Sequence, residues 1–102
     1  MKRSSEDIKW SNTVRERDKW TCQRCGHFFP EGRRRGLDAA HIWSRRIKRT
    51  RHDLENGVSL CTGCHNSWAH ANPLEFHDWL KQRMGEEQYT SLMVRAKRVE
   101  GK

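Results

Sequence analysis

Two closely spaced cysteine pairs constrain this chain more than any other feature of its sequence. Cys22 and Cys25 form the first pair, and Cys61 and Cys64 the second, each with two residues between the thiols. Zn²⁺ binds four thiolates at about 2.3 Å in a closed tetrahedral site, and paired cysteines at this spacing are typical of such sites. Four unlinked thiols or two disulfides are the alternatives, but neither explains why the cysteines come in two such pairs. We expect a structural zinc held by all four.

The composition also requires a cross-link of this kind. Only 16 of the 102 residues are Leu, Ile, Val or Phe, while 21 Lys and Arg against 13 Asp and Glu give a net charge of +8. Short chains with so few aliphatic residues gain little stability from burial alone. We therefore expect one small domain over residues 1–102, in which metal binding contributes to folding.

The same features predict where the protein works. The first seven residues are polar and charged, unlike a signal peptide, and no run approaches the roughly 18 apolar residues of a membrane span. Disulfides are rare in reducing compartments, where close cysteine pairs are more often metal ligands. We expect a cytoplasmic protein that does not bind membranes, and the basic charge makes nucleic acid its expected partner.

Hydrophobic spacing and capping residues predict the elements. A helix is expected over 5–19, followed by a zinc-binding core over 20–71 with short strands in the apolar runs 37–43 and 57–60. A further helix over 65–71 is possible. Two C-terminal helices are expected over 73–84 and 86–98, separated by Gly85. At the start of the first, Asn72 would be the N-cap, Pro73 the first helical residue and Glu75 the side chain that reaches back to the cap.

Three further residues interleave with the cysteines in a specific order. His41 lies in the first apolar run, Asn56 directly precedes the second, and His65 directly follows the last cysteine. This order resembles that of the HNH endonucleases, over about residues 14–70. The stretches LDAAHIWSRR and RHDLENGVSLCTGCHNSWAHANPLEF are most similar to small phage-type members of that family, including the Rap/NinG type of recombination endonuclease.

The resemblance implies a fold and a mechanism. The fold would be α+β, a small ββα-metal domain with a two-stranded antiparallel hairpin, helices and the four-cysteine zinc site. His41 would be the general base that takes a proton from water, and Asn56 would hydrogen-bond across the hairpin and orient His41. His65 would bind a divalent cation such as Mg²⁺, Mn²⁺ or Ni²⁺, which polarises the scissile phosphate. His70 is a rival to His65 as that ligand.

One position departs from the family pattern. Many members carry an aspartate or histidine directly before the general base as a second metal ligand, and this chain has Ala40 there. Asp53 and Asp38 are the candidates to replace it, and Asp53 is favoured.

A basic run follows the expected base. Its members are Arg45, Arg46, Lys48, Arg49 and Arg51, and a shorter run, Arg33 to Arg35, precedes His41. Positive charge beside a catalytic strand suits a phosphate backbone, but such contacts carry no base sequence, so low or structure-directed specificity is expected. Trp43 and Trp68 are expected to pack in the core rather than to stack on bases.

These patterns favour a metal-dependent DNA endonuclease that hydrolyses phosphodiester bonds, with one site per chain and hence nicking by a monomer. A homodimer through Leu92 and Met93 would allow paired cuts, and a phage packaging or recombination protein is a further candidate partner. The main alternative is a non-catalytic zinc-ribbon DNA-binding protein, accessory to a phage or bacterial DNA-processing machine, which Ala40 favours. A protein-interaction module docking through the C-terminal helices is a third class.

Overall fold

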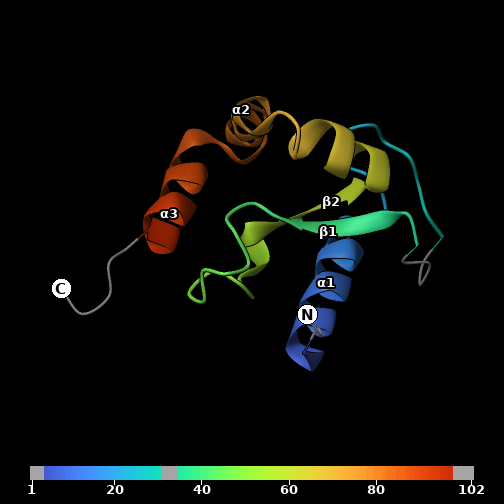
Figure 1. The fold of residues 1–102 in the computed structure, drawn as a ribbon, viewed down its shortest axis with the longest axis horizontal. Helices are drawn as coiled ribbons and strands as arrows, with labels where there is room; N and C mark the ends of the chain where they lie inside the picture. The colour runs from blue at the N-terminus through green and yellow to red at the C-terminus, as the bar shows by residue number, and fades with distance from the viewer. Residues whose placement is uncertain (1–3, 31–34, 98–102) are drawn as a thin grey trace.

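The computed structural model describes residues 4–30 and 35–97 (Figure 1). Helix α1 leads to a two-stranded hairpin, and a short π-helical segment, η2, then leads to two C-terminal helices. The elements in order are α1 (Ser5–Arg17), β1 (Leu37–His41), the 3-10 turn η1 (Leu54–Asn56), β2 (Gly57–Cys61), η2 (Cys64–Ala69), α2 (Pro73–Met84) and α3 (Glu86–Lys97). No helix in these two described ranges is long and apolar enough to cross a membrane.

Helix α1 begins with a reciprocal cap. The Ser4 hydroxyl accepts a hydrogen bond from the backbone N–H of Asp7, and the Asp7 carboxylate accepts one from the backbone N–H of Ser4, both at 3.1 Å. Each bond satisfies an N–H that the helix itself cannot. The helix ends at Arg17, two residues before the expected end, because Lys19 and Trp20 adopt left-handed backbone angles (φ 57° and 54°) that turn the chain away.

The hairpin is antiparallel, as expected for this α+β fold. Leu37 pairs with Cys61 at one end, and His41 pairs with Gly57 at the other. The zinc-binding end and the His41 end of the hairpin are therefore separated by the length of the strands. Gly57 permits α1 to approach closely, since a Cβ added there would lie 2.6 Å from Cζ2 of Trp10.

Helix α1 packs against the hairpin from one side, and η2 with α2 lies on the other (Figure 1). The core between them is built from fully buried aliphatic side chains and aromatic rings. Its least exposed aliphatic members are Val14, Leu37, Val58, Leu60, Leu80 and Leu92. Leu92 is fully buried and Met93 is half-buried, so α3 uses these side chains to pack on its own chain, and Leu92 is not available for the expected homodimer surface.

The start of α2 also differs from the prediction. Glu75 does not reach back to the cap, because its carboxylate accepts a hydrogen bond from Nε1 of Trp68 at 3.0 Å. Asn72 is the N-cap residue, as expected, and its carbonyl accepts from the Phe76 N–H at 3.0 Å, but its side chain donates to the Trp68 carbonyl at 3.3 Å instead of capping the helix. Both residues thus join α2 to η2. Trp68 is 7% exposed, which confirms its expected place in the core, while Trp43 is half-buried.

Candidate functional site

The four cysteines form one cluster. Their sulfur atoms all lie within 4.8 Å of one another, and the thiols form no disulfide. Four sulfurs bound tetrahedrally at 2.3 Å would be about 3.8 Å apart, and the Cys25 and Cys61 sulfurs are 3.9 Å apart. The cluster therefore has the donor set and dimensions of a structural metal site such as zinc.

Backbone N–H groups point at the sulfurs in both pairs. The N–H of Cys25 donates to Sγ of Cys22, and the N–H of Cys64 donates to Sγ of Cys61, each at 3.4 Å. Gly26, which follows the first pair, has the positive φ (82°) expected of that turn. Burial opposes ionisation of the Cys22 thiol, but hydrogen bonds from the Cys25 N–H and other backbone groups lower its pKa to about 7. Such bonds favour the thiolate that a metal requires.

A groove of about 880 Å³ lies beside the hairpin. β1, the loop after it, η2 and the start of α2 form most of its wall. Four of the six histidines line it, together with two aspartates and two arginines: His41, His65, His70, His77, Asp7, Asp38, Arg15 and Arg45. The structure thus brings the expected base, His41, and the expected metal ligand, His65, into one groove.

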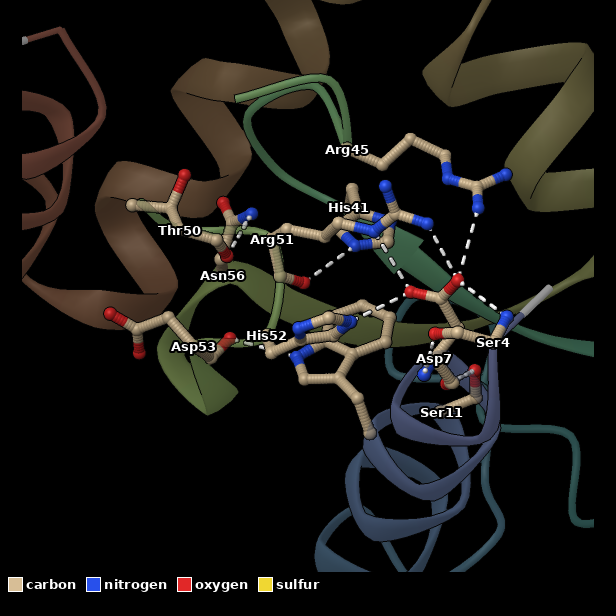
Figure 2. Close-up of polar contacts among 11 residues, drawn as sticks. Ser4, Asp7, Ser11, His41, Arg45, Thr50, Arg51, His52, Asp53 and Asn56 are labelled. Atoms are coloured by element: carbon tan, nitrogen blue, oxygen red, sulfur yellow. Dashed lines mark hydrogen bonds and ion pairs between the residues drawn. The ribbon is translucent and has the colours of Figure 1, made fainter. Parts of the chain in front are cut away.

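His41, at the end of β1, is held on two sides. Its ring stacks on Trp10 with centroids 4.0 Å apart and planes 11° apart, and its Nε2 lies 2.9 Å from the Arg51 carbonyl oxygen (Figure 2). A carbonyl only accepts, so Nε2 carries the proton and Nδ1 of the neutral ring keeps its lone pair. Burial lowers the pKa of His41 below its usual value, although the hydrogen bond to Arg51 partly offsets this. The ring is therefore neutral at pH 7 and able to accept a proton.

Asn56 acts on the backbone near His41 rather than on the imidazole. It is fully buried, its Oδ1 accepts from the Trp43 N–H at 2.8 Å, and its Nδ2 donates to the carbonyls of Trp43 and Thr50, each at 3.0 Å. The amide thus closes the loop that carries Arg51. The expected orienting contact is indirect: Asn56 fixes the loop, and the loop carbonyl contacts His41.

His65 meets a carboxylate from the opposite element. As expected it lies directly after Cys64, in η2, and its Nδ1 is 2.9 Å from Oδ2 of Asp38 on β1. The His70 ring packs edge-on against His65 with centroids 4.5 Å apart. Asp38 lies two residues before Ala40, and side chains two apart on a strand share a face. β1 therefore carries a carboxylate on the same face as Ala40, two residues before it, and Ala40 is the position at which the family pattern has its ligand.

Asp53 lies elsewhere. Its Oδ1 accepts from the Glu55 N–H at 2.9 Å, which caps η1, and its Oδ2 is 2.9 Å from Nη2 of Arg95 in α3. The structure therefore does not bring Asp53 to His65, and the carboxylate beside His65 is that of Asp38. The strand period of two was the sequence signal for Asp38, whereas Asp53 has the ordinary pattern of a turn-capping residue.

The basic run divides into two groups. Arg46, Lys48 and Arg49 are exposed, whereas Arg45 and Arg51 are only partly exposed and form ion pairs with Asp7 of α1. Their charges are thus partly neutralised, which weakens the expectation that both contact DNA. Arg33 and Arg34 lie outside the described residues. Sequence reasoning missed Asp7, since an acidic residue in the first turn of a helix is explained by capping alone.

Comparison with known families places this site in a wider context. A family model described as HNH endonuclease matches residues 22–69, a segment that includes both cysteine pairs, His41, Asn56 and His65. The match gives no subtype within that family, and it leaves α1, α2 and α3 outside. No curated protein and no solved structure matches the chain. The match suggests nuclease activity in general.

Proposed function

We propose that this protein is a metal-dependent DNA endonuclease of the HNH type that hydrolyses phosphodiester bonds. One observation carries the proposal: a neutral histidine with a bare Nδ1, His41, lines the same groove as a histidine–carboxylate pair, His65 and Asp38. A proton acceptor and a candidate cation site in one groove are the two components that phosphodiester hydrolysis requires.

His41 is the general base. Its pKa is lowered by burial, so the imidazole is unprotonated at neutral pH, and the Arg51 carbonyl keeps the proton on Nε2. A water molecule in the groove would give its proton to Nδ1 as it attacks the phosphorus. General bases of this kind contribute about 10²- to 10⁴-fold to the rate.

His65 and Asp38 are the candidate ligands of the catalytic cation. Two ligands at right angles around Mg²⁺ or Mn²⁺, each at about 2.1 Å, would be about 3.0 Å apart, and the two facing atoms are 2.9 Å apart. Imidazole suits Ni²⁺, and carboxylate suits Mg²⁺ and Mn²⁺, so all three cations are candidates. When bound, the cation would polarise the scissile phosphate and stabilise the charge on the leaving oxygen.

DNA contact is proposed for the exposed members of the basic run. Arg46, Lys48 and Arg49 lie on the loop directly after β1, which also contributes to the wall of the groove. Contacts from such side chains to phosphates position the duplex without reading its sequence. With one proposed active site per chain, we expect single-strand nicks of low or structure-directed specificity.

Cleavage of supercoiled plasmid in Mg²⁺, Mn²⁺ or Ni²⁺ tests the proposal. The parent protein should nick the plasmid, and His41→Ala should reduce the rate at least about 100-fold. His27→Ala is the matched control, because His27 is an exposed histidine in the first cysteine turn and does not line the groove. Zinc content and melting temperature are compared in all three proteins, so that loss of the fold is not mistaken for loss of the base.

The alternative is a non-catalytic DNA-binding protein built on the same zinc site. Ala40 favours it, because the usual ligand position holds a methyl group. If the folded parent and His41→Ala both retard DNA in a gel but neither cuts it with any of the three cations, the endonuclease proposal fails and this alternative replaces it.

A further inference from the structure

The carboxylate of Asp7 is buried between α1 and the loop that holds His41 (Figure 2). The residue lies outside the segment that matches the HNH model, and none of the roles assigned above includes it. We call residues 44–52, which run from the end of β1 toward η1, the basic loop. Asp7 is the residue of α1 on which this loop converges.

Three side chains of the basic loop contact this one carboxylate. Arg51 binds it with two hydrogen bonds, Nε to Oδ1 at 2.9 Å and Nη2 to Oδ2 at 2.6 Å. His52 Nε2 lies 2.7 Å from Oδ1, and Arg45 Nη2 lies 3.3 Å from Oδ2. With the Ser4 N–H also donating, both oxygens are fully used. The side chain is only 5% exposed.

A buried carboxylate is stable only when such donors replace its water. The Arg51 guanidinium, aided by His52 and Ser4, holds the pKa of Asp7 far below its usual range despite burial. A two-bond arginine–carboxylate pair fixes direction as well as distance. The Arg51 side chain is therefore held in one orientation by α1, and the backbone of the same residue supplies the carbonyl that accepts from His41.

The same face of α1 contacts His41 a second time. Trp10 lies three residues after Asp7, which places both on one side of the helix. Its ring stacks on His41, and its Nε1 donates to the Asp53 carbonyl, just past the end of the basic loop, at 2.9 Å. Helix α1 thus acts on His41 through two residues. Trp10 holds the ring by stacking, and Asp7, through Arg51, holds the carbonyl that sets the tautomer of the ring.

We propose that Asp7 is a positioning residue for His41: by anchoring Arg51, it places the Arg51 carbonyl so that His41 keeps its proton on Nε2 and presents a bare Nδ1 to the groove. The catalytic part of this proposal depends on the endonuclease function proposed above, whereas the structural part does not. N-terminal helix α1 is then part of the active site rather than an appendage to the matched segment.

The variant Asp7→Asn tests the positioning role of Asp7, and Asp18→Asn is compared with it. Asp18 is a matched control, because it too is a buried aspartate of the α1 region that accepts from a backbone N–H, that of Ser59, and pairs with an arginine, Arg17. Among the described residues its carboxylate contacts Arg17, Ser59 and Arg83, which all lie outside the basic loop. The first measurement is long-range ¹H–¹⁵N NMR of His41, which distinguishes the Nε2–H from the Nδ1–H tautomer. The second is kcat and KM for plasmid nicking.

We expect the parent and Asp18→Asn to show the Nε2–H tautomer, and Asp7→Asn to show a mixture. The kcat of Asp7→Asn should fall about 10- to 100-fold with KM nearly unchanged, since small misplacements of a catalytic group cost about this much. Arg51→Ala keeps the carbonyl but loses the anchor, so it should reproduce the effect, and the double variant should lose no more than either single one.

An unchanged His41 tautomer in folded Asp7→Asn, or in Arg51→Ala if the first variant does not fold, would overturn the proposal. Equal losses of kcat in Asp7→Asn and Asp18→Asn would also overturn it, because they would indicate general loosening. The NMR result does not require cleavage. An inactive parent with a tautomer that depends on Asp7 would therefore refute the endonuclease while leaving the positioning role intact.

Discussion

At the scale of single residues, the chemistry of the groove depends on which nitrogen or oxygen atom of each side chain is available. His41 uses Nε2 on a carbonyl and keeps Nδ1 for a proton, whereas Nδ1 of His65 faces Oδ2 of Asp38, and these two atoms are the proposed cation ligands. A partner atom fixes which nitrogen of a histidine is available and how the ring is oriented, which is what a base or a metal ligand requires. The chemistry therefore depends on the partners of these histidines as much as on the histidines.

Two carboxylates compete for the role of second cation ligand, and a pair of variants separates them. Asp38→Asn should raise the Mn²⁺ concentration needed for half-maximal nicking at least about 10-fold, because it replaces a proposed ligand, and loss even of a carboxylate that only supports a metal-binding histidine typically costs 10- to 100-fold in affinity or activity. Asp53→Asn should leave that concentration unchanged, because Asp53 caps η1 and pairs with Arg95. The opposite ranking would return Asp53 to the ligand set.

The dependence of nicking on pH follows from the lowered pKa of His41. Burial disfavours the imidazolium, so the base stays unprotonated to a lower pH than an ordinary histidine of pKa 6.5. The acid limb of the kcat/KM profile should therefore have its midpoint below pH 6.5. A midpoint above 6.5 would mean that another group controls the rate, or that the pKa of His41 is raised rather than lowered.

The free energy of unfolding should also depend on pH through His41. A histidine whose pKa is lower in the folded state binds its proton more readily when unfolded, so stability is complete above pH 6.5 and declines as the pH falls through that value. Burial lowers the pKa of His77 in the same direction. Urea denaturation at pH 7.5 and pH 5.5 should show the loss, and His41→Phe should reduce it. Equal stability of the parent at the two pH values would contradict this sign.

At the scale of elements, the sequence predicted the order and type of helices and strands better than their contacts. Apolar spacing and Gly85 located α2 and α3, because local propensity and capping decide helices of this length. The same local signals placed Asn72 correctly at the N-cap, but they misassigned the Glu75 side chain, and the side chains of both residues contact Trp68 in η2. A side chain that can satisfy either its own helix or a neighbouring element gives no local sign of which it does.

For the candidate site too, the sequence predicted the main residues but not their contacts. His41, Asn56 and His65 followed from their order between the cysteines, but their partners Asp38, Asp7 and Trp10 depend on tertiary contacts. Asp7 and Arg51 are 44 residues apart, and nothing near either one in the sequence signals the pair. Such long-range pairs require the fold to be known.

The approach of α1 to the hairpin at Gly57 gives a prediction at this scale. Gly57→Ala would place a Cβ 2.6 Å from the Trp10 ring and 2.8 Å from Val14. Overpacking of this kind costs about 1–3 kcal/mol, and displacing Trp10 would also disturb its stacking on His41. Thermal denaturation should show the loss. Gly63→Ala is the control, because its Cβ would meet only the Cys61 sulfur, at 4.0 Å, and equal destabilisation by both would contradict the packing argument.

At the scale of the whole molecule, the cysteine cluster joins parts of the chain that otherwise have few reasons to meet. Cys22 and Cys25 lie in the loop after α1, Cys61 ends β2, and Cys64 opens η2. The Gln23 N–H donates to the Ser59 carbonyl at 2.9 Å, so the first turn also adds one hydrogen bond to the hairpin. With so few aliphatic residues, the α1 loop, hairpin and η2 depend on this junction for their relative placement.

Removing the metal of the cysteine cluster should therefore have a different effect from omitting the proposed catalytic cation of the groove. Stripping the cysteine site with a strong zinc chelator should unfold the protein, since binding of about 10–16 kcal/mol in comparable sites is also folding free energy. The far-UV circular dichroism should lose its helical signal and regain it on adding Zn²⁺. Omitting Mg²⁺ or Mn²⁺ should instead abolish nicking while the helical signal and melting temperature stay constant, because the proposed groove ligands His65 and Asp38 lie on elements that the cysteine site already holds in place. A chelated protein that keeps a cooperative thermal transition would show that burial alone holds this chain, and the cysteine cluster would then need another role.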